Sequence, residues 1–237
     1  MNTHAHDGRS IAIITSHLSF DEHGGSNYSI HRLAVELSDR GDDVTVYTLN
    51  FDDENHVPVP HDYGVEPLDL GNRTLVDGAV KLYHRFGELA ETHDLLHIYI
   101  PGIMPLAGRW RTHNPDGVPV VGTLNGYSVF CTNTSRMADG CWQHCTLSKK
   151  LRHARSLNFS TAAQAVYHEL ETAPMLSAFD RIYCLSPAVR DIYADLGVDE
   201  DVLTVIPNMV DREFANDDVT DVDAEAVAIA DGGGRDA

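Results

Sequence analysis

Lysine is nearly absent from this chain of 237 residues, which contains only Lys81, Lys149 and Lys150. The 36 acidic and 17 basic residues give a formal net charge of -19. Phosphate groups of nucleic acids and anionic membrane surfaces bind clustered lysine or arginine, so neither kind of partner is expected. A surplus of aspartate keeps a surface hydrated at high salt and indicates halophilic adaptation. The alternative is an ordinary acidic protein of the cytosol.

Long apolar runs are also missing. The N-terminus, MNTHAHDGRS, has no basic segment followed by an apolar one, and no window reaches the roughly 20 apolar residues of a membrane-spanning helix. We therefore expect a cytoplasmic protein without a transmembrane segment. Four cysteines are too few to predict a disulfide scaffold in a chain of this length. The hydrophobic content of 43% is sufficient for a sizeable buried core.

Apolar runs typical of strands alternate with apolar residues at helical spacing. The runs typical of strands buried in a parallel sheet are residues 10–18, 44–49, 65–70, 95–100 and 118–124. Helical spacing predicts helices over residues 30–37, 75–89, 104–112 and 162–177. Residues 180–211 then predict a strand, a Ser-Pro turn, an amphipathic helix and a strand. This alternation predicts an α/β fold with a doubly wound, mostly parallel, Rossmann-like sheet, whose ligands bind at the carboxyl ends of the strands.

The predicted elements form one domain with a segment at each end. We assign residues 1–9 to an N-terminal extension and residues 10–214 to the domain, with an irregular polar insertion at 126–158. Residues 215–237 are acidic and glycine-rich, which indicates a tail or linker. Gly41 lies where a glycine cap would end the first helix.

Gly24 and Gly25 lie between the first predicted strand and the first predicted helix. A backbone without Cβ atoms can bring its amide hydrogens close to an anion at a helix N-terminus, and a diphosphate would suit that position. The alternative is a tight turn that simply needs glycine. The pattern G-x-G-x-x-G is absent after this strand, which argues against a nicotinamide cofactor. His17 and His23 are notable only for lying at the mouth of the first strand.

Several segments, in the same order, resemble family 4 glycosyltransferases of the GT-B fold. HGGSNYSIHRLAVELSDRGDDVTVYT is similar to the opening of that family, and VVGTLNGY followed by FDRIYCLSPAVRDIYADLGV and VIPNMVD continues the match. The resemblance spans roughly Ile11 to Asp211. It implies the N-terminal, acceptor-side domain of such an enzyme, which is half of a GT-B protein, with the C-terminal donor domain absent.

The resemblance also implies roles for particular residues. Gly24 and Gly25 match the glycine loop that faces the diphosphate of the donor. The residues that would border the acceptor are Ser26, Asn27 and Tyr28.

The resemblance implies a role in catalysis for one further residue, Asn125, and raises the same question for His97. Asn125 stands near the donor sugar, where many members of the family have histidine. Because an amide cannot titrate, Asn125 would orient a hydroxyl group while the departing phosphate oxygen takes the proton of the acceptor. His97, at the end of the preceding strand, would compensate for the missing histidine, and the alternative is that His97 is structural.

The reaction implied by the resemblance is a retaining transfer of a sugar from a nucleotide-diphosphate donor to a hydroxyl of a glycan, lipid or small molecule. The nucleotide-sugar is a substrate, and no tightly bound cofactor is expected. The family holds its donor chiefly in the C-terminal domain, so we expect negligible turnover from this polypeptide alone and a separately encoded domain as one possible partner. The alternative function is a non-catalytic binding or regulatory half that acts with a separate subunit.

The irregular insertion contains three cysteines and a histidine that are close in sequence, Cys131, Cys141, His144 and Cys145. Three thiolates and an imidazole can hold a structural zinc ion tetrahedrally, and a zinc-dependent hydrolase is then a third hypothesis. The spacing C-x9-C-x3-C is unusual for zinc fingers, so free thiols or a cysteine-lined acceptor loop are favoured and no metal is predicted. Cys184, inside a strand, is expected to be a small buried hydrophobe.

Overall fold

The computed structural model describes residues 8–18, 25–49, 62–70, 75–130, 146–148, 166 and 170–207. These residues belong to one compact unit that ends at Pro207, and a second unit, Asn208–Ala237, lies outside the described residues. The domain boundary predicted between residues 214 and 215 and most of the predicted insertion therefore also lie outside them.

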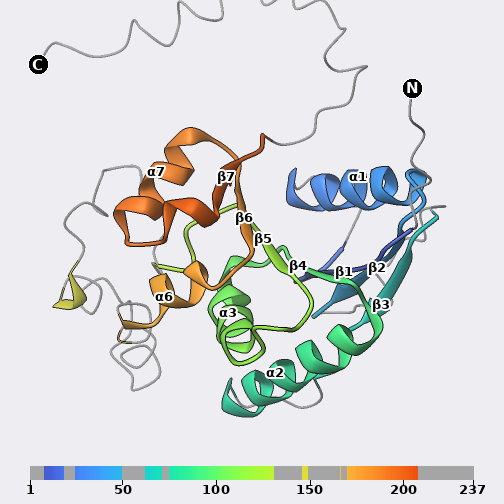
Figure 1. Ribbon diagram of the computed structural model, residues 1–237, viewed down its shortest axis with the longest axis horizontal. Coiled ribbons are helices and arrows are strands. Elements are labelled where there is room, and N and C mark those ends of the chain that lie inside the picture. The colour runs from blue at the N-terminus through green and yellow to red at the C-terminus, as the bar shows by residue number, and fades with distance from the viewer. Residues whose placement is uncertain are drawn as a thin grey trace, which may run out of the picture. The chain divides into compact units, whose positions relative to one another are not determined.

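The described strands form one parallel sheet with the order β3-β2-β1-β4-β5-β6-β7 (Figure 1). Their bounds are β1 Ser10–Thr15, β2 Asp43–Thr48, β3 Gly64–Pro67, β4 Leu95–Ile98, β5 Val120–Leu124, β6 Arg181–Cys184 and β7 Leu203–Val205. The helices are α1 Gly25–Asp39, α2 Leu75–Thr92, α3 Met104–His113, α6 Thr172–Ser177 and α7 Pro187–Asp195, with short 3-10 turns η1 Pro101–Ile103 and η4 Glu200–Val202. The predicted parallel α/β sheet is confirmed.

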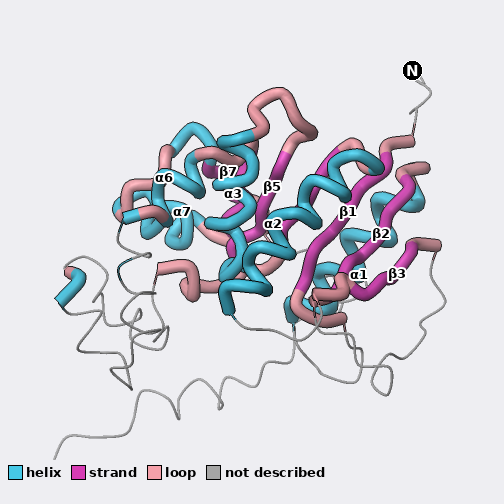
Figure 2. Tube along the Cα trace, turned by 90° about the horizontal axis from the view of Figure 1, so that it is seen from below, coloured by secondary structure: helices cyan, strands magenta, loops and turns pink. Residues whose placement is uncertain are grey.

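Helices cover both faces of the sheet. In Figure 1, α1 lies on one face and α2 and α3 lie on the other, and in Figure 2 α2 and α3 cross in front of the strands. Ile13 of β1 packs with Ile30 and Ala34 of α1, whereas Ile14 belongs to the core cluster that contains Phe86 of α2. The run at residues 11–14 is continuously apolar because successive side chains enter two different cores.

Local signals in the sequence explain several ends of elements. Gly41 and Gly197 have φ angles of +96° and +93°, and they follow α1 and α7 as left-handed caps. The glycine cap predicted at Gly41 is therefore confirmed. Ser186 caps the start of α7, since its side chain accepts a hydrogen bond from the backbone amide of Val189, and Pro187 is the first residue of the helix.

Some bounds differ from the prediction by a few residues. The strand β4 ends at Ile98 and not at Ile100, because Pro101 opens the turn η1 and the amide of Ile103 bonds the carbonyl of Ile100. The helix predicted over 162–177 is described continuously only as α6, from Thr172, and most of its first half lies outside the described residues.

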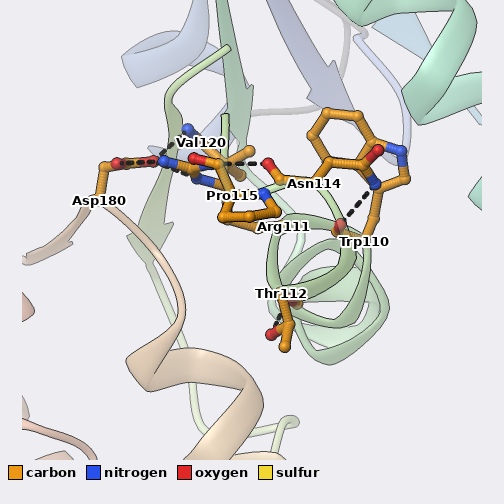
Figure 3. Close-up of polar contacts among 8 residues, drawn as sticks. Trp110, Arg111, Thr112, Asn114, Pro115, Val120 and Asp180 are labelled. Atoms are coloured by element: carbon orange, nitrogen blue, oxygen red, sulfur yellow. Dashed lines mark hydrogen bonds and ion pairs between the residues drawn. The ribbon is translucent and has the colours of Figure 1, made fainter. Parts of the chain in front are cut away.

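Arg111 joins three segments at the amino ends of β5 and β6 (Figure 3). Its side chain donates to Asp180, the residue before β6, and Asp180 also accepts from the backbone amide of Val120 in β5. Arg111 Nη1 donates in addition to the carbonyl oxygens of Asn114 and Pro115, at 2.7 and 2.6 Å. These contacts secure the edge of the sheet opposite to the one where ligands are expected.

Candidate functional site

The strands of a parallel sheet end on the same edge, and here we call that edge the carboxyl edge, marked by Thr15 of β1, Ile98 of β4 and Leu124 of β5. From β1 the sheet is extended first on one side, by β2 and β3, and then on the other side, by β4 and the strands that follow it. The strand order therefore reverses between β1 and β4, which is the switch point of the sheet. Open α/β sheets bind ligands at such points. Gly25 begins the helix after β1 and Asn125 directly follows β5, which puts both residues at the carboxyl edge.

Gly25 is the exposed first residue of α1. A Cβ atom added there would meet nothing within 4 Å, and the described glycines with positive φ are only Gly41 and Gly197. The described fold therefore shows neither a close contact nor a positive φ that would require glycine at position 25. Gly24 and His23 lie outside the described residues.

The first turn of α1 presents polar side chains of two kinds. Ser26 and Tyr28 are exposed, Tyr28 to 43%, whereas Asn27 is only 4% exposed and is packed inside the protein. The hydroxyl of Ser29 donates a hydrogen bond of 2.8 Å to the carbonyl oxygen of Gly25. This first turn contains no acidic residue. An anion at the start of α1 would meet no carboxylate from the turn itself.

Asn125 is exposed, and hydrogen bonds hold the backbone around it. Its Nδ2 atom donates to the carbonyl oxygen of Tyr99 at 3.5 Å. The carbonyl oxygen of the next residue, Gly126, accepts a hydrogen bond of 2.6 Å from the hydroxyl of Tyr193 in α7. With Nδ2 turned toward Tyr99, the Oδ1 atom of Asn125 is the part of the amide left to accept a hydrogen bond from a ligand.

His97 lies inside the sheet, one residue before the end of β4, and is 5% exposed. Its Nε2 atom is 2.8 Å from Oγ1 of Thr123, and its ring centroid is 5.7 Å from that of Tyr99 and 6.0 Å from that of Tyr183. Burial lowers the pKa of His97 to about 4. The imidazole is therefore neutral near pH 7, and its geometry is that of a side chain that holds neighbouring strands in place.

The remaining candidates from the sequence are the cysteines and His17. The cysteine and histidine set predicted in the insertion, Cys131, Cys141, His144 and Cys145, lies outside the described residues. Within the described residues no group of three or more potential metal ligands occurs. Cys184 is a buried free thiol whose pKa burial raises to about 11, which confirms the predicted small hydrophobe. His17 is exposed after β1, and its Nδ1 atom is 3.0 Å from the hydroxyl of Ser16.

Three residues near the site were missed by the sequence analysis. Tyr99 and Thr123 lie on the same face of the sheet as His97, and counting in steps of two from His97 and Asn125 would have found them. Tyr193 lies in the helix that the sequence predicts only as amphipathic. Its hydroxyl partner is 67 residues away in sequence, so no local pattern indicates the contact.

Comparisons with known proteins agree with this architecture. A family model described as Glycosyltransferase Family 4 matches residues 23–214. No curated protein matches the chain.

No helix in the described part of the chain is both long and apolar enough to cross a membrane.

Solved structures share the fold at low sequence identity. Sucrose-phosphate synthase from Thermosynechococcus elongatus is 16% identical with a TM-score of 0.55, and the match covers 84% of this chain and 48% of that one. A glycosyltransferase from Rickettsia africae is 13% identical with a TM-score of 0.51, covering 94% and 48%. Anabaena HepE in complex with UDP is 12% identical with a TM-score of 0.50, covering 86% and 45%. The chain thus spans about half the length of these structures.

Proposed function

Because this chain belongs to glycosyltransferase family 4, we propose that it supplies the acceptor side of an enzyme that transfers a sugar from a nucleotide-diphosphate donor to a hydroxyl group. The donor is a nucleotide-sugar, and the transfer retains the anomeric configuration of the sugar. A second half, in the same protein or in a separate subunit, supplies most of the contacts to the nucleotide.

The observation that supports the proposal is the position of Gly25 and Asn125 at the carboxyl edge, beside the switch point between β1 and β4. Free backbone amides and the helix dipole favour an anion at the start of α1. The open space at Gly25 gives a diphosphate room to approach the backbone. The first turn of α1 itself adds no carboxylate that would repel an anion, in a chain whose net charge is -19.

Exposure and hydrogen bonding support the remaining roles, apart from that of Gly24, which lies outside the described residues and is assigned by the resemblance alone. Gly24 and Gly25 face the diphosphate, and the exposed Ser26 and Tyr28 border the acceptor, with Asn27 supporting this turn from inside. The Oδ1 atom of Asn125 accepts a hydrogen bond from a neighbouring hydroxyl of the bound sugar or acceptor and thereby orients the substrate, which leaves the proton of the attacking hydroxyl to the departing phosphate oxygen.

The chemical step needs no titrating side chain from this half. The bond between the anomeric carbon and the phosphate oxygen breaks, the acceptor oxygen bonds to the same carbon, and the departing phosphate oxygen takes the proton of the acceptor. His97 supports the ends of β4 and β5 through Thr123, because a buried imidazole that is neutral near pH 7 is poorly placed to carry a proton to solvent.

The test compares two glycines that both lie in open space near helix starts. In Gly25→Leu the new side chain would block the approach of a diphosphate, whereas in Gly78→Leu it would project from α2, since neither Cβ has a neighbour within 4 Å. The chain, joined to or reconstituted with the half that holds the nucleotide, is assayed with a panel of nucleoside-diphosphate sugars, UDP-glucose among them, for release of the nucleoside diphosphate. We expect a loss of more than about tenfold for Gly25→Leu and little change for Gly78→Leu.

Three outcomes of this assay are informative. Equal transfer by Gly25→Leu and the unaltered protein would remove Gly25 from the donor site. An inverted product, identified by NMR of the anomeric proton, would contradict retention. Binding of UDP without transfer from any donor would favour the alternative function, a binding or regulatory half that acts with a separate subunit.

A further inference from the structure

We propose that Tyr193 is a positioning residue that fixes Asn125 at the carboxyl edge through the carbonyl group of Gly126. This inference rests on the proposed function of Asn125. Tyr193 comes from α7, far from the site in sequence, and is 0% exposed. Its hydroxyl donates a hydrogen bond of 2.6 Å to the carbonyl oxygen of the residue next to Asn125.

The backbone at Gly126 needs such a fixed point. A Cβ atom at Gly126 would meet nothing within 4 Å, so no packing of its own restricts this residue. Glycine also has the widest choice of backbone angles of any residue. A carbonyl group that is held by a buried donor removes much of that freedom, and it does so directly beside Asn125.

The surroundings of Tyr193 hold its hydroxyl in one place. The ring stacks on Tyr127, with centroids 6.3 Å apart and an angle of 20° between the planes, and is tilted by 58° against Phe130 at 5.2 Å. Burial raises the pKa of Tyr193, so the hydroxyl stays protonated and remains a donor. Because a buried hydroxyl is unfavourable without a partner, its presence in an otherwise apolar cluster points to a function for the bond itself.

Asn125 is held from the opposite side as well. The carbonyl oxygen of Tyr99, which follows β4, accepts from Asn125 Nδ2, while α7 acts on the next residue through Tyr193. The two contacts lie at successive residues and come from different elements. Together the two contacts fix the orientation of the side-chain amide of Asn125 and of the peptide group that follows it. Orientation of a substrate hydroxyl for reaction requires such precise placement.

The experiment that tests this inference removes only the hydroxyl group of Tyr193. Tyr193→Phe keeps the ring and its packing, and the matched control is Tyr63→Phe, which also loses a buried hydroxyl, one that is 2.8 Å from His31 Nδ1. Hydrogen exchange of the amides of residues 125–127 is measured in the full-length protein, and thermal unfolding is recorded for both variants. We expect exchange to become about tenfold faster in Tyr193→Phe and to stay unchanged in Tyr63→Phe, while both variants remain folded.

A kinetic measurement separates this inference from the proposed function. With a nucleotide-sugar that the unaltered protein uses, Tyr193→Phe should lower kcat about tenfold and leave KM for the donor within about twofold. Unchanged exchange at residues 125–127 overturns the inference, whatever the kinetics. Faster exchange with unchanged kcat also overturns it. Absence of transfer by the unaltered chain in the presence of the half that holds the nucleotide contradicts the proposed function instead, and the exchange result then decides whether Tyr193 fixes this segment.

Discussion

Arg111 and Asp180 form a two-pronged ion pair, in which Nε and Nη2 of the arginine donate to the two carboxylate oxygens at 2.9 and 3.0 Å (Figure 3). The same carboxylate accepts from the backbone amide of Val120 at 2.8 Å. Charge-assisted pairs with this geometry are stronger than ordinary surface ion pairs. Because the Arg111 side chain is only 15% exposed, water cannot easily replace the carboxylate as its partner.

Replacement of Asp180 should destabilise the protein measurably. We expect Asp180→Ala to lower the free energy of unfolding by about 2–3 kcal/mol, since a largely buried guanidinium and a backbone amide lose their acceptor. Urea denaturation monitored by circular dichroism measures the effect. Asp191→Ala is the control, because the pair of Arg190 and Asp191 is exposed and should matter little. Equal effects of the two substitutions would contradict the structural role of Asp180.

The same pair predicts a dependence on pH. Burial alone would raise the pKa of Asp180, but hydrogen bonds from Arg111 and Val120 outweigh it and hold the pKa below its usual value. The stabilisation is present above the pKa of the unfolded state, about 3.9, and is lost as the pH falls through the lower pKa of the folded state. Unfolding free energies measured from pH 6 downward should converge for the unaltered protein and Asp180→Ala.

Gly108 is required by close packing between α3 and α6. A Cβ atom at this position would overlap the backbone carbonyl of Met175, which cannot move aside as a side chain could. We expect Gly108→Ala to cost about 1–3 kcal/mol of stability. The control is Gly78→Ala, which has open space and should gain about 0.5–1 kcal/mol from the better helix propensity of alanine. Thermal unfolding of both variants measures these two effects. A Gly108→Ala variant as stable as the unaltered protein would contradict the close packing of α3 against α6.

Sequence reasoning reached the elements of this fold more readily than the contacts between them. The β-branched run of β1 and the stripe of α2 are local patterns, so both elements were predicted to within a few residues. The partner of Arg111 is 69 residues away and that of Tyr193 is 67, and no periodicity encodes such distances. Gly25 was named from its place before the first predicted helix and Asn125 from a family resemblance, and their position at one edge needed the strand order.

His97 should make stability decrease on mild acidification. Its pKa is about 4 in the folded protein, against about 6.5 when unfolded, so the unfolded state binds more protons between these values. The stabilisation is complete above about pH 6.5 and decreases by up to about 1.4 kcal/mol per pH unit toward pH 4. His97→Gln keeps a polar partner for Thr123 but cannot titrate. The difference in unfolding free energy between His97→Gln and the unaltered protein should change between about pH 6.5 and pH 4. A difference that stays constant over this range would contradict the conclusion that His97 is buried and neutral.

Substitution of Asn125 by histidine should add a pH dependence to sugar transfer. An imidazole at this exposed position titrates near its ordinary value of about 6.5, whereas the amide of Asn125 does not titrate. We expect Asn125→His to retain transfer above about pH 7, where the neutral ring can accept a hydrogen bond, and to lose it below about pH 6. Asn125→Ala should be impaired at every pH. Identical pH profiles for Asn125→His and the unaltered protein would place residue 125 away from the reacting hydroxyl.

The strand order has a consequence for how the chain assembles during synthesis. The inner strand β1 is made first and can pair with β2 soon afterwards, but its other neighbour, β4, begins only at Leu95. At about 5–20 residues per second, a ribosome delivers β4 roughly two to nine seconds after β2. Throughout that interval the apolar strand β1 has one unpaired side, so the nascent polypeptide carries an aggregation-prone edge that chaperones would have to shield.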